Sequence, residues 1–482
     1  MLEKDVEDLV RKVQSFNTEL NYVEVKEAHI DCPKKLYDTI SAFSNLNGGG
    51  ILLFGLREAE SFAVVGVYDA ADLQKKVTEQ CKQMQPVVRA LFTCCKIEGK
   101  MVVSAEIPEI DIADKPCFYK GKGRLTGSYI RVGDSDEQMT EYEIYSYDAF
   151  RKKYQDDIRV LDQLDFARLD KNKLDQYMIA LRNRKERLAA LPKEEVCELM
   201  SITKNRVPTL TGLLLFGKYP QGYFPQLRIT AIVVPGTEVG ETGSIGERFI
   251  DNRRIDGTLP EMLDEAVRFV HKNMSTKTII DKATGVRRDR TEYPMEAVRE
   301  VVLNALIHRD YSIHTEGMPI QIQIFKDRLE VKNPGGIYGR FKIDHVGKVQ
   351  PDTRNPVLAT MMEDLGLTEN RYSGIPTIYR AMKEWGLREP VFADERGCFS
   401  VILYNEVHAA LETKTGKPSE EHSLLQFCQK PRSRAELAEF VGVKTAYHVM
   451  QRYILPLIAD GKLEMTLPDK PKSRYQKFVT RR

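Results

Sequence analysis

The order of apolar and polar positions predicts alternating strands and helices near the start of the chain. Val23 and Val25 alternate with polar neighbours, as in a strand that is buried on one face. Leu36, Ile40 and Phe43 recur at i, i+4 and i+7, which predicts a helix with one apolar face. A run of glycines and then an apolar stretch follow, and they predict a loop and a second strand. The predicted helix, loop and second strand occupy residues 34–44, 45–50 and 51–55.

The middle of the chain shows a second alternation. Val298, Val301, Val302 and Ala305 have helical spacing and lie on one face of a predicted helix. Tyr293-Pro294 precedes them, and proline is tolerated where a helix begins. Two strand-like runs and a further helix come next. These predicted elements occupy residues 320–325, 328–331 and 373–382.

The last part of the chain predicts a winged helix-turn-helix. Ser433-x-x-Glu436 is a capping box that opens a second short helix, after a first apolar stretch near residue 425. A third helix is expected over residues 444–452, followed by a strand pair that ends near residue 479. In such folds the third helix enters the major groove of DNA and the wing contacts phosphate.

These patterns predict a multidomain α/β (α+β) protein. We expect an N-terminal domain, a charged helical connector, a middle α/β region that contains a compact domain at about 291–405, a linker and the C-terminal unit. The expected boundaries are residues 1–135, 136–207, 208–405, 406–420 and 421–482.

Composition narrows the class of protein. The 482 residues are 42% hydrophobic and 29% charged, which is ordinary for a globular chain. No apolar run approaches the roughly 18–20 residues that span a bilayer, and the N-terminus has no apolar signal segment. Eight cysteines form no CxxC pair, as is typical of reduced thiols. The composition therefore argues against membrane, secreted, fibrous and disordered classes, and we expect a cytoplasmic protein without a membrane partner.

The balanced net charge of +2 conceals an uneven distribution. Residues 421–482 carry 12 Lys and Arg against six Asp and Glu, a net charge of +6, so the other 420 residues sum to −4. A basic C-terminal unit favours a nucleic-acid partner, with DNA ahead of RNA, although many winged helices bind only proteins. The predicted DNA-reading residues are Lys444, Thr445, Tyr447, His448 and Arg452, with Lys470, Lys472 and Arg474 on phosphates.

Carboxylates near the N-terminus suggest a metal site. Glu19, Glu24 and Lys26 lie around the first strand, and Glu58 follows the second. Converging carboxylates can hold Mg²⁺ or Mn²⁺ and promote phosphodiester hydrolysis. Ordinary surface charge explains the same spacing, because a charged chain offers such triplets by composition alone.

Three segments resemble the AlbA-like domain of Schlafen proteins: TELNYVEVKEA, ISAFSNLNGGGILLFGL and GSYIRVGDSDEQMT. The resemblance implies DNA or RNA binding, with Asn47, Gly48, Gly49 and Arg131 as contacts. In nuclease-active members, acids at positions resembling Glu19, Glu24 and Glu58, with Lys26, would hold metal and cleave RNA or DNA. The chain has GLRE where the family more often has GVDD, a departure at the third acid.

Glu300, Asn304 and His308 recur every four residues, which places them within an arc of about 80° on one helix. The surrounding segments, REVVLNALIHRDY, EVKNPGG, RNPVLA and SGI, resemble the GHKL group of ATP-binding domains in its RecG-related form. The resemblance implies an α/β sandwich in which Glu300 positions water and Asn304 ligates Mg²⁺. Further nucleotide contacts would be Asn333, Gly335, Gly336, Ser373 and Gly374. The group's usual DxGxG is replaced here by Asn333-Pro334-Gly335-Gly336, and hydrogen-bonded fold residues in a retired pocket are the alternative.

The combined hypothesis is a nucleic-acid-binding transcriptional regulator gated by a nucleotide in the middle domain. The alternatives are a Schlafen-like metal-dependent endonuclease with a defence role and a weak ATPase. Because linked binding sites raise effective concentration, we also expect a homo-oligomer.

Overall fold

The computed structural model describes residues 1–280, 287–340, 343, 346, 348, 352–368, 373–395, 397–405, 424–425, 427–441, 450, 454–459, 461–466 and 476–481. The chain separates into two compact units, which are residues 1–144 with 411–482, and residues 145–410. Both contain mixed sheets, so the multidomain α/β class is confirmed.

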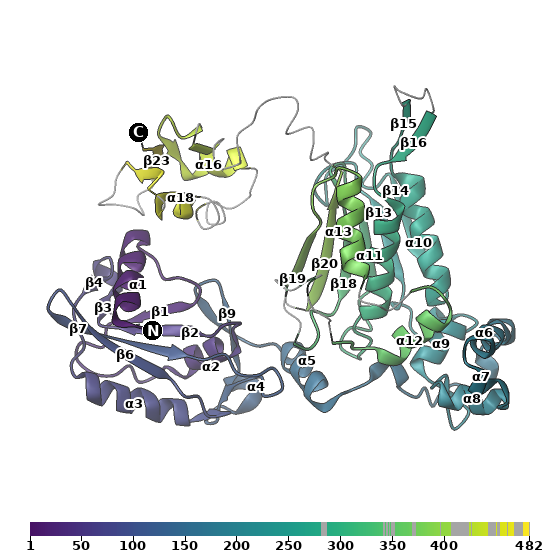
Figure 1. Ribbon diagram of the computed structural model, residues 1–482, viewed down its shortest axis with the longest axis horizontal. Helices are drawn as coiled ribbons and strands as arrows, with labels where there is room; N and C mark the ends of the chain where they lie inside the picture. The colour runs from purple at the N-terminus through teal and green to yellow at the C-terminus, as the bar shows by residue number, and fades with distance from the viewer. Residues whose placement is uncertain are drawn as a thin grey trace. The chain divides into compact units, whose positions relative to one another are not determined.

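The N-terminal part of the first unit is built on a four-stranded sheet in the order β1-β2-β7-β6 (Figure 1). β1 and β2 are parallel, whereas β2, β7 and β6 pair antiparallel. Apolar side chains of α1 pack on one face of this sheet, and those of α2 and α3 pack on the other. The elements are α1 (Glu3–Phe16), β1 (Val23–Lys26), α2 (Tyr37–Asn45), β2 (Gly50–Phe54), α3 (Ala70–Lys82), β6 (Leu91–Ile97) and β7 (Lys100–Ile107).

The predicted first strand, helix and second strand of this domain are confirmed as β1, α2 and β2. Smaller elements complete the domain. Two of them, β9 and β10, lie in the third segment of the Schlafen resemblance and pack against α2. The smaller elements are β3 (Leu56–Arg57), η1 (Glu58–Glu60), β4 (Ala63–Val64), β5 (Met84–Gln85), β8 (Phe118–Tyr119), α4 (Gly123–Gly127), β9 (Tyr129–Val132) and β10 (Ser135–Gln138).

The second unit contains a six-stranded mixed sheet in the order β14-β13-β17-β18-β20-β19. Helices α10, α11 and α13 lie side by side against it (Figure 1). The predicted middle helix, strand pair and following helix are confirmed as α11, β17, β18 and α13. The bounds are β13 (Ile229–Val233), β14 (Asp251–Ile255), α10 (Leu259–Asn273), α11 (Met295–His308), β17 (Ile320–Ile324), β18 (Arg328–Pro334), α12 (Pro356–Asp364), α13 (Gly374–Glu384), β19 (Val391–Glu395) and β20 (Cys398–Tyr404).

The charged segment treated as a connector contributes buried side chains to the same core as this sheet, among them Leu174, Tyr177 and Leu181. A separate hairpin, β15 (Thr276–Ile280) with β16 (Arg287–Thr291), completes the second unit. The remaining elements are α5 (Glu141–Lys152), η2 (Asp156–Ile158), η3 (Phe166–Arg168), α6 (Lys171–Arg184), α7 (Glu186–Ala189), α8 (Lys193–Leu199), β11 (Thr203–Lys204), β12 (Val207–Pro208), α9 (Leu210–Phe216) and η4 (Pro220–Gly222).

The C-terminal part contains a three-stranded sheet in the order β21-β23-β22. The predicted capping box is present, because the Ser433 backbone N–H donates to the Glu436 carboxylate at 2.9 Å and the Glu436 N–H donates to Ser433 Oγ at 3.3 Å. The described elements are β21 (Arg432–Ser433), α16 (Arg434–Val441), α18 (Leu455–Ala459), β22 (Leu463–Met465) and β23 (Lys477–Thr480). The winged helix-turn-helix remains a prediction.

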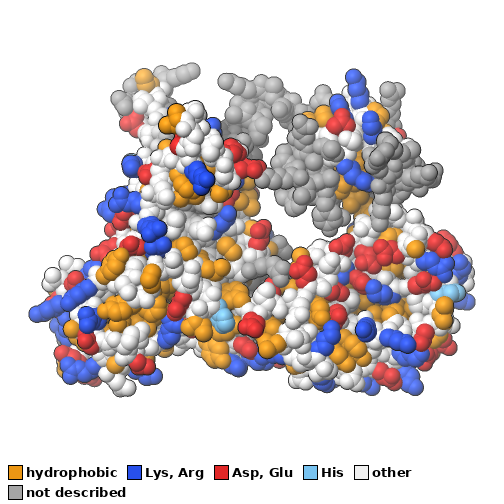
Figure 2. Space-filling view, turned by 180° about the vertical axis from the view of Figure 1, so that it is seen from behind, with side chains coloured by type: hydrophobic (Ala, Val, Ile, Leu, Met, Phe, Trp, Pro, Cys, Tyr) orange, Lys and Arg blue, Asp and Glu red, His pale blue; other side chains and the backbone are white. Residues whose placement is uncertain are grey.

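Surface composition agrees with the near-neutral total charge. On the face shown in Figure 2, basic and acidic side chains of the described residues are interspersed instead of forming one broad field of a single sign. Within the same residues, no helix is both long enough and apolar enough to cross a membrane.

Candidate functional site

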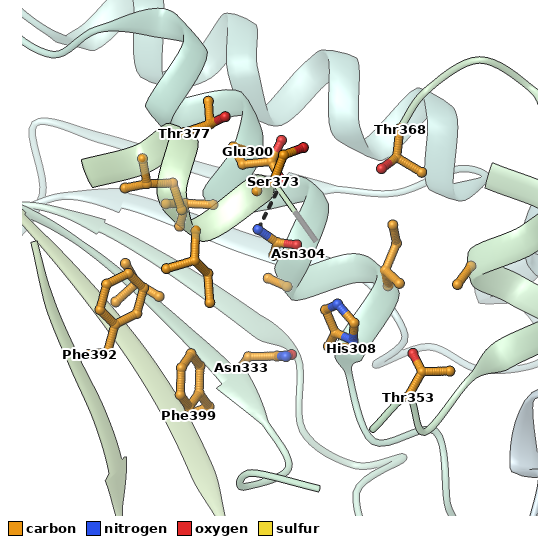
Figure 3. A pocket seen from close by; sticks show the side chains of 18 of the residues that line it. Glu300, Asn304, His308, Asn333, Thr353, Thr368, Ser373, Thr377, Phe392 and Phe399 are labelled. Carbon is orange, nitrogen blue, oxygen red and sulfur yellow. Dashed lines mark hydrogen bonds between the residues drawn. The ribbon is translucent and has the colours of Figure 1, made fainter. Parts of the chain in front are cut away.

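A cavity of about 990 Å³ lies in the second unit, between α11 and α13 and the strands β18, β19 and β20 (Figure 3). All eight residues that the sequence analysis assigned to nucleotide binding line this one cavity. They are Glu300, Asn304, His308, Asn333, Gly335, Gly336, Ser373 and Gly374.

α11 supplies the polar side of the cavity. Its apolar face is buried, and Glu300 and Asn304 face the cavity one turn apart, with Asn304 Nδ2 donating to Glu300 Oε1 at 3.1 Å. Burial raises the pKa of Glu300, against the opposing effect of the Asn304 hydrogen bond. His308 lines the cavity and is accessible there, and desolvation by the surrounding residues, helped by the nearby Arg354 charge, lowers its pKa to about 4. His308 is therefore neutral near pH 7 and can donate or accept a hydrogen bond there.

Asn333 is a polar residue on the side of the cavity that the sheet forms. It lies near the end of β18, opposite Phe399 of β20, and only 5% of it is exposed. Its Oδ1 atom is buried and has no hydrogen-bond partner. A buried acceptor without a partner costs about 1–3 kcal/mol, so a ligand that donates to it would recover that energy. Phe392 and Phe399 line the cavity beside it (Figure 3).

Two glycines allow close approach of the cavity walls. Gly335 has φ +104°, and a Cβ atom there would lie 2.6 Å from Asp310 Cβ. A Cβ atom at Gly374 would lie 2.1 Å from Glu300 Oε1, so the start of α13 sits directly on the carboxylate of α11. A helix N-terminus favours a negative group at this place.

Arg354 and Asp310 are cavity-region residues to which the sequence analysis gave no role. Arg354 Nη1 pairs with Asp310 Oδ2 at 2.5 Å, and Nη2 donates to the Gly336 carbonyl at 3.1 Å. Both side chains are almost fully buried. The segment RNPVLA was a signal for Arg354, but the sequence did not show its partner, which lies 44 positions earlier.

The predicted N-terminal acids meet around an arginine. Arg131 Nη1 pairs with Glu24 Oε2 and with Asp136 Oδ1, each at 2.8 Å, and Nη2 lies 3.7 Å from Glu19 Oε2. Lys26 Nζ also contacts Glu24, at 2.5 Å. Only 1% of the Arg131 side chain is exposed. This cluster, Glu19, Glu24, Arg131 and Asp136, is called the Arg131 cluster below.

Two sequence predictions need correction here. Arg131 was expected to contact nucleic-acid phosphate, but its guanidinium is buried among carboxylates and does not reach the surface. Glu58 was expected to join Glu19 and Glu24 at a metal, but it lies exposed on η1, and Asp136 is the third acid of the cluster. No group of three or more His, Cys, Asp and Glu side chains suited to a metal was found within the described ranges. Because Arg131 pairs with both Glu24 and Asp136, the cluster fits a structural role.

Glu19 is the carboxyl group of the cluster whose pKa is raised. Desolvation, together with repulsion from Glu24, raises the pKa of Glu19 to about 7. The pKa of Glu24 is lowered instead, because Lys26 and Arg131 outweigh the effect of its burial.

The Glu19→Gln variant is expected to change how stability depends on pH. Gln keeps the oxygen that accepts the Val25 N–H, at 2.7 Å in the wild type, but it cannot ionise. Because the folded pKa of Glu19 lies above its unfolded value, its contribution to stability is present at low pH and is lost as pH rises through about 7. The free energy of unfolding of E19Q should therefore rise relative to wild type between about pH 5 and pH 8 in urea titrations. The exposed E58Q variant is the control, and parallel pH curves for wild type and E19Q would contradict the expectation.

The predicted glycine loop has a structural function. Gly48 and Gly49 have φ values of +83° and +75°. The Gly48 N–H donates to Glu109 Oε2 at 2.8 Å, and Lys115 holds the other oxygen of Glu109 at 3.1 Å. Asn47 and Gly48 are exposed at the tip of the loop, whereas Gly49 is buried. Asn47 and Gly48 remain predicted nucleic-acid contacts.

Alanine substitution should destabilise the protein more at Gly49 than at Gly48. A Cβ atom at Gly48 would meet open space, whereas one at Gly49 would lie 2.3 Å from the Ile107 carbonyl oxygen and 2.9 Å from the Glu109 backbone nitrogen. We expect G48A to cost about 1 kcal/mol for its positive φ, and G49A about 2–4 kcal/mol because the backbone must also shift. Urea unfolding followed by circular dichroism measures both, and equal losses would rule out the close approach as the cause.

The predicted DNA-reading and phosphate-binding residues of the C-terminal unit lie outside the described residues. They are Lys444, Thr445, Tyr447, His448, Arg452, Lys470, Lys472 and Arg474.

Family models match four parts of the chain. Residues 19–140 match "Schlafen, AlbA_2", and residues 317–403 match the HATPase_c_4 model, described as "Putative ATP-dependent DNA helicase recG C-terminal". Residues 421–479 match the "Filamentation induced by cAMP protein Fic-like, C-terminal domain", and residues 147–230 match a domain of unknown function. The chain therefore contains a Schlafen AlbA_2 domain and a RecG-related HATPase_c_4 region, as the sequence resemblances indicated.

Two solved structures are similar to the chain. The DIP2311 protein from Corynebacterium diphtheriae is 20% identical, with a TM-score of 0.41 and 92% of each chain covered. The N-terminal domain of a RecG-related protein from Nitrosomonas europaea is 27% identical, with a TM-score of 0.23; the match covers 29% of this chain and 94% of that one. A comparison with curated proteins gave no match.

Proposed function

We propose that the chain is a nucleic-acid-binding regulator whose binding is controlled by a purine nucleotide, ATP in the first instance, in the cavity of the second unit. The observation that carries this proposal is the convergence of all eight predicted nucleotide-binding residues on one cavity. The HATPase_c_4 match over residues 317–403 also supports it.

The residues present fit a nucleotide with Mg²⁺. Asn333 offers an unpaired acceptor for a base edge, and Phe392 and Phe399 offer an apolar wall for a base. Glu300 and Asn304 carry the oxygen ligands that Mg²⁺ prefers, and the ion commonly takes one or two carboxylates together with nucleotide phosphates. When bound, Mg²⁺ would neutralise phosphate charge. Hydrolysis is not part of this proposal.

Isothermal titration of the full chain with ATP and Mg²⁺ tests nucleotide binding. We expect saturable heat with wild type and weaker binding with Asn304→Ala, which removes the amide that faces Glu300. Arg253→Met, a change at an exposed residue of β14 that does not line the cavity, is the control and should bind like wild type. Absence of heat with wild type would refute the nucleotide part of the proposal.

DNA is the proposed partner, with RNA second. The AlbA_2 match and the net charge of +6 over residues 421–482 support this choice. We expect duplex affinity to fall steeply with salt, to disappear when residues 421–482 are deleted, and to change when ATP is added. Unchanged affinity after the deletion would refute the assignment of DNA binding to that unit. Light scattering in the same buffers measures the proposed homo-oligomer.

A further inference from the structure

We propose that the Asn333 carboxamide reads the hydrogen-bonding edge of a purine ring, so that the cavity takes adenine and guanine nucleotides with similar affinity. This inference rests on the proposed nucleotide site and specifies what that site selects. It starts from the unpaired Oδ1 of Asn333, a residue that is 95% buried and lines the cavity.

The apolar surroundings of Asn333 indicate a flat ring as its partner. The Phe392 and Phe399 rings lie with their centroids 6.2 Å apart and are tilted by 34°. Val331 and Val401 of the same sheet also line this side. Such a surface gains from contact with an aromatic face, while the buried Asn333 oxygen requires a donor. A heteroaromatic ring with polar atoms on its edge satisfies both needs.

The carboxamide is complementary to two purine edges. It carries one acceptor and two N–H donors in one plane. Adenine offers an exocyclic N–H donor beside the N1 acceptor, and guanine offers the O6 acceptor beside an N1–H donor. Turning the carboxamide over exchanges its oxygen and nitrogen and so fits either base. A carboxylate at this position could only accept, and its negative oxygen would face guanine O6.

Ring size limits the choice to purines. Pyrimidine bases present similar edges on a smaller ring, so they would cover less of the Phe392 and Phe399 surfaces. Weaker binding of CTP than of ATP is therefore expected.

Titration of the full chain with N-methylanthraniloyl-labelled ATP, GTP and CTP in Mg²⁺ tests the inference. We expect the Kd values of wild type for ATP and GTP to differ by less than about threefold. N333D should weaken GTP at least about tenfold more than ATP, because it loses the donor that faces O6, and N333L should weaken both. N252D, which adds the same charge on the exposed edge strand β14, is the matched control and should behave like wild type. Trp385 emission confirms folding of each variant.

The outcomes separate this inference from the proposed function. A wild-type preference of more than about 30-fold for one purine would overturn the inference while leaving a nucleotide site in place. CTP binding as tight as ATP binding would overturn the purine assignment. If no nucleotide binds to wild type, the proposed function itself fails.

Discussion

Arg131→Met is expected to destabilise the N-terminal domain by about 3–5 kcal/mol, the usual cost of leaving buried charges without their partner. The guanidinium lies among Glu19, Glu24 and Asp136, and each of these carboxylates is largely buried. Lys26 continues to neutralise Glu24 in the variant, but the described contacts leave Asp136 with only the Thr39 hydroxyl, at 2.6 Å. Methionine also gives up the cation–π contact with Phe43, where the guanidinium lies 5.2 Å from the ring centre.

Two probes together separate the unfolding of the affected unit from that of the second unit. Trp385 is the single tryptophan and belongs to the second unit, so its fluorescence reports unfolding there. We expect urea unfolding of R131M followed by circular dichroism to begin at lower urea, while the Trp385 transition stays in place. Arg11→Met is the control, because Arg11 is 74% exposed and its ion pairs are worth about 0–1 kcal/mol. A similar stability for R131M and R11M would contradict the proposed structural role of the Arg131 cluster.

The double variant Arg131→Met with Asp136→Asn tests whether the loss in R131M comes from the unpaired carboxylate of Asp136. Removing both charges avoids the buried unpaired carboxylate, so the double variant should be more stable than R131M alone. A strictly additive loss would show that the two residues do not interact in solution.

The Arg131 cluster shows what sequence spacing can and cannot predict. Glu19 and Glu24 both contact Arg131, and they lie close in the sequence because Glu19 precedes the short strand β1 and Glu24 belongs to it. The third acid was sought at Glu58, next to the neighbouring strand, whereas Asp136 arrives through the distant β9–β10 hairpin. Both Arg131 and Asp136 stood in the segment GSYIRVGDSDEQMT. What the sequence could not show is that the arginine turns inward, since this depends on the packing of β9 against α2.

The cavity was easier to predict because helical periodicity fixes one of its sides. A spacing of four places Glu300, Asn304 and His308 on one face of α11, and the apolar positions fix which face is buried. The outcome for Asn333 differs from the simplest expectation. The sequence analysis named Asn333 as a nucleotide contact, although it stands where the GHKL group usually has aspartate, and the structure leaves an unpaired acceptor there. The pairing of Arg354 with Asp310 was not predictable, because it depends on how the chain returns after β18.

Arg354→Met is expected to destabilise the second unit by about 3–5 kcal/mol and to abolish nucleotide binding. Asp310 is 97% buried at its side chain, and R354M removes the guanidinium that pairs with its carboxylate. The same guanidinium holds the Gly336 carbonyl and lies 5.1 Å from the Tyr338 ring centre, so its loss also releases two residues that line the cavity.

Loss of Arg354 should also change the protonation of His308. The positive charge of Arg354 adds to burial in lowering the pKa of His308, so the pKa should rise in R354M. A histidine whose folded pKa is depressed makes folding less favourable at low pH, and that penalty should become smaller in the variant. We therefore expect the stability gap between wild type and R354M to narrow as pH falls from about 7 to about 4.

Urea titrations followed by Trp385 fluorescence measure the stability of this unit directly. R380M is the matched control, because Arg380 also lines the cavity but pairs with Glu296 where both side chains are half-exposed. Its cost should be about 0–1 kcal/mol. The double variant Asp310→Asn with Arg354→Met should recover part of the stability without restoring nucleotide binding, because the unpaired charge is gone while the support of Gly336 and Tyr338 is still missing. Full recovery of both properties would show that Arg354 acts only by neutralising Asp310 and does not shape the cavity wall.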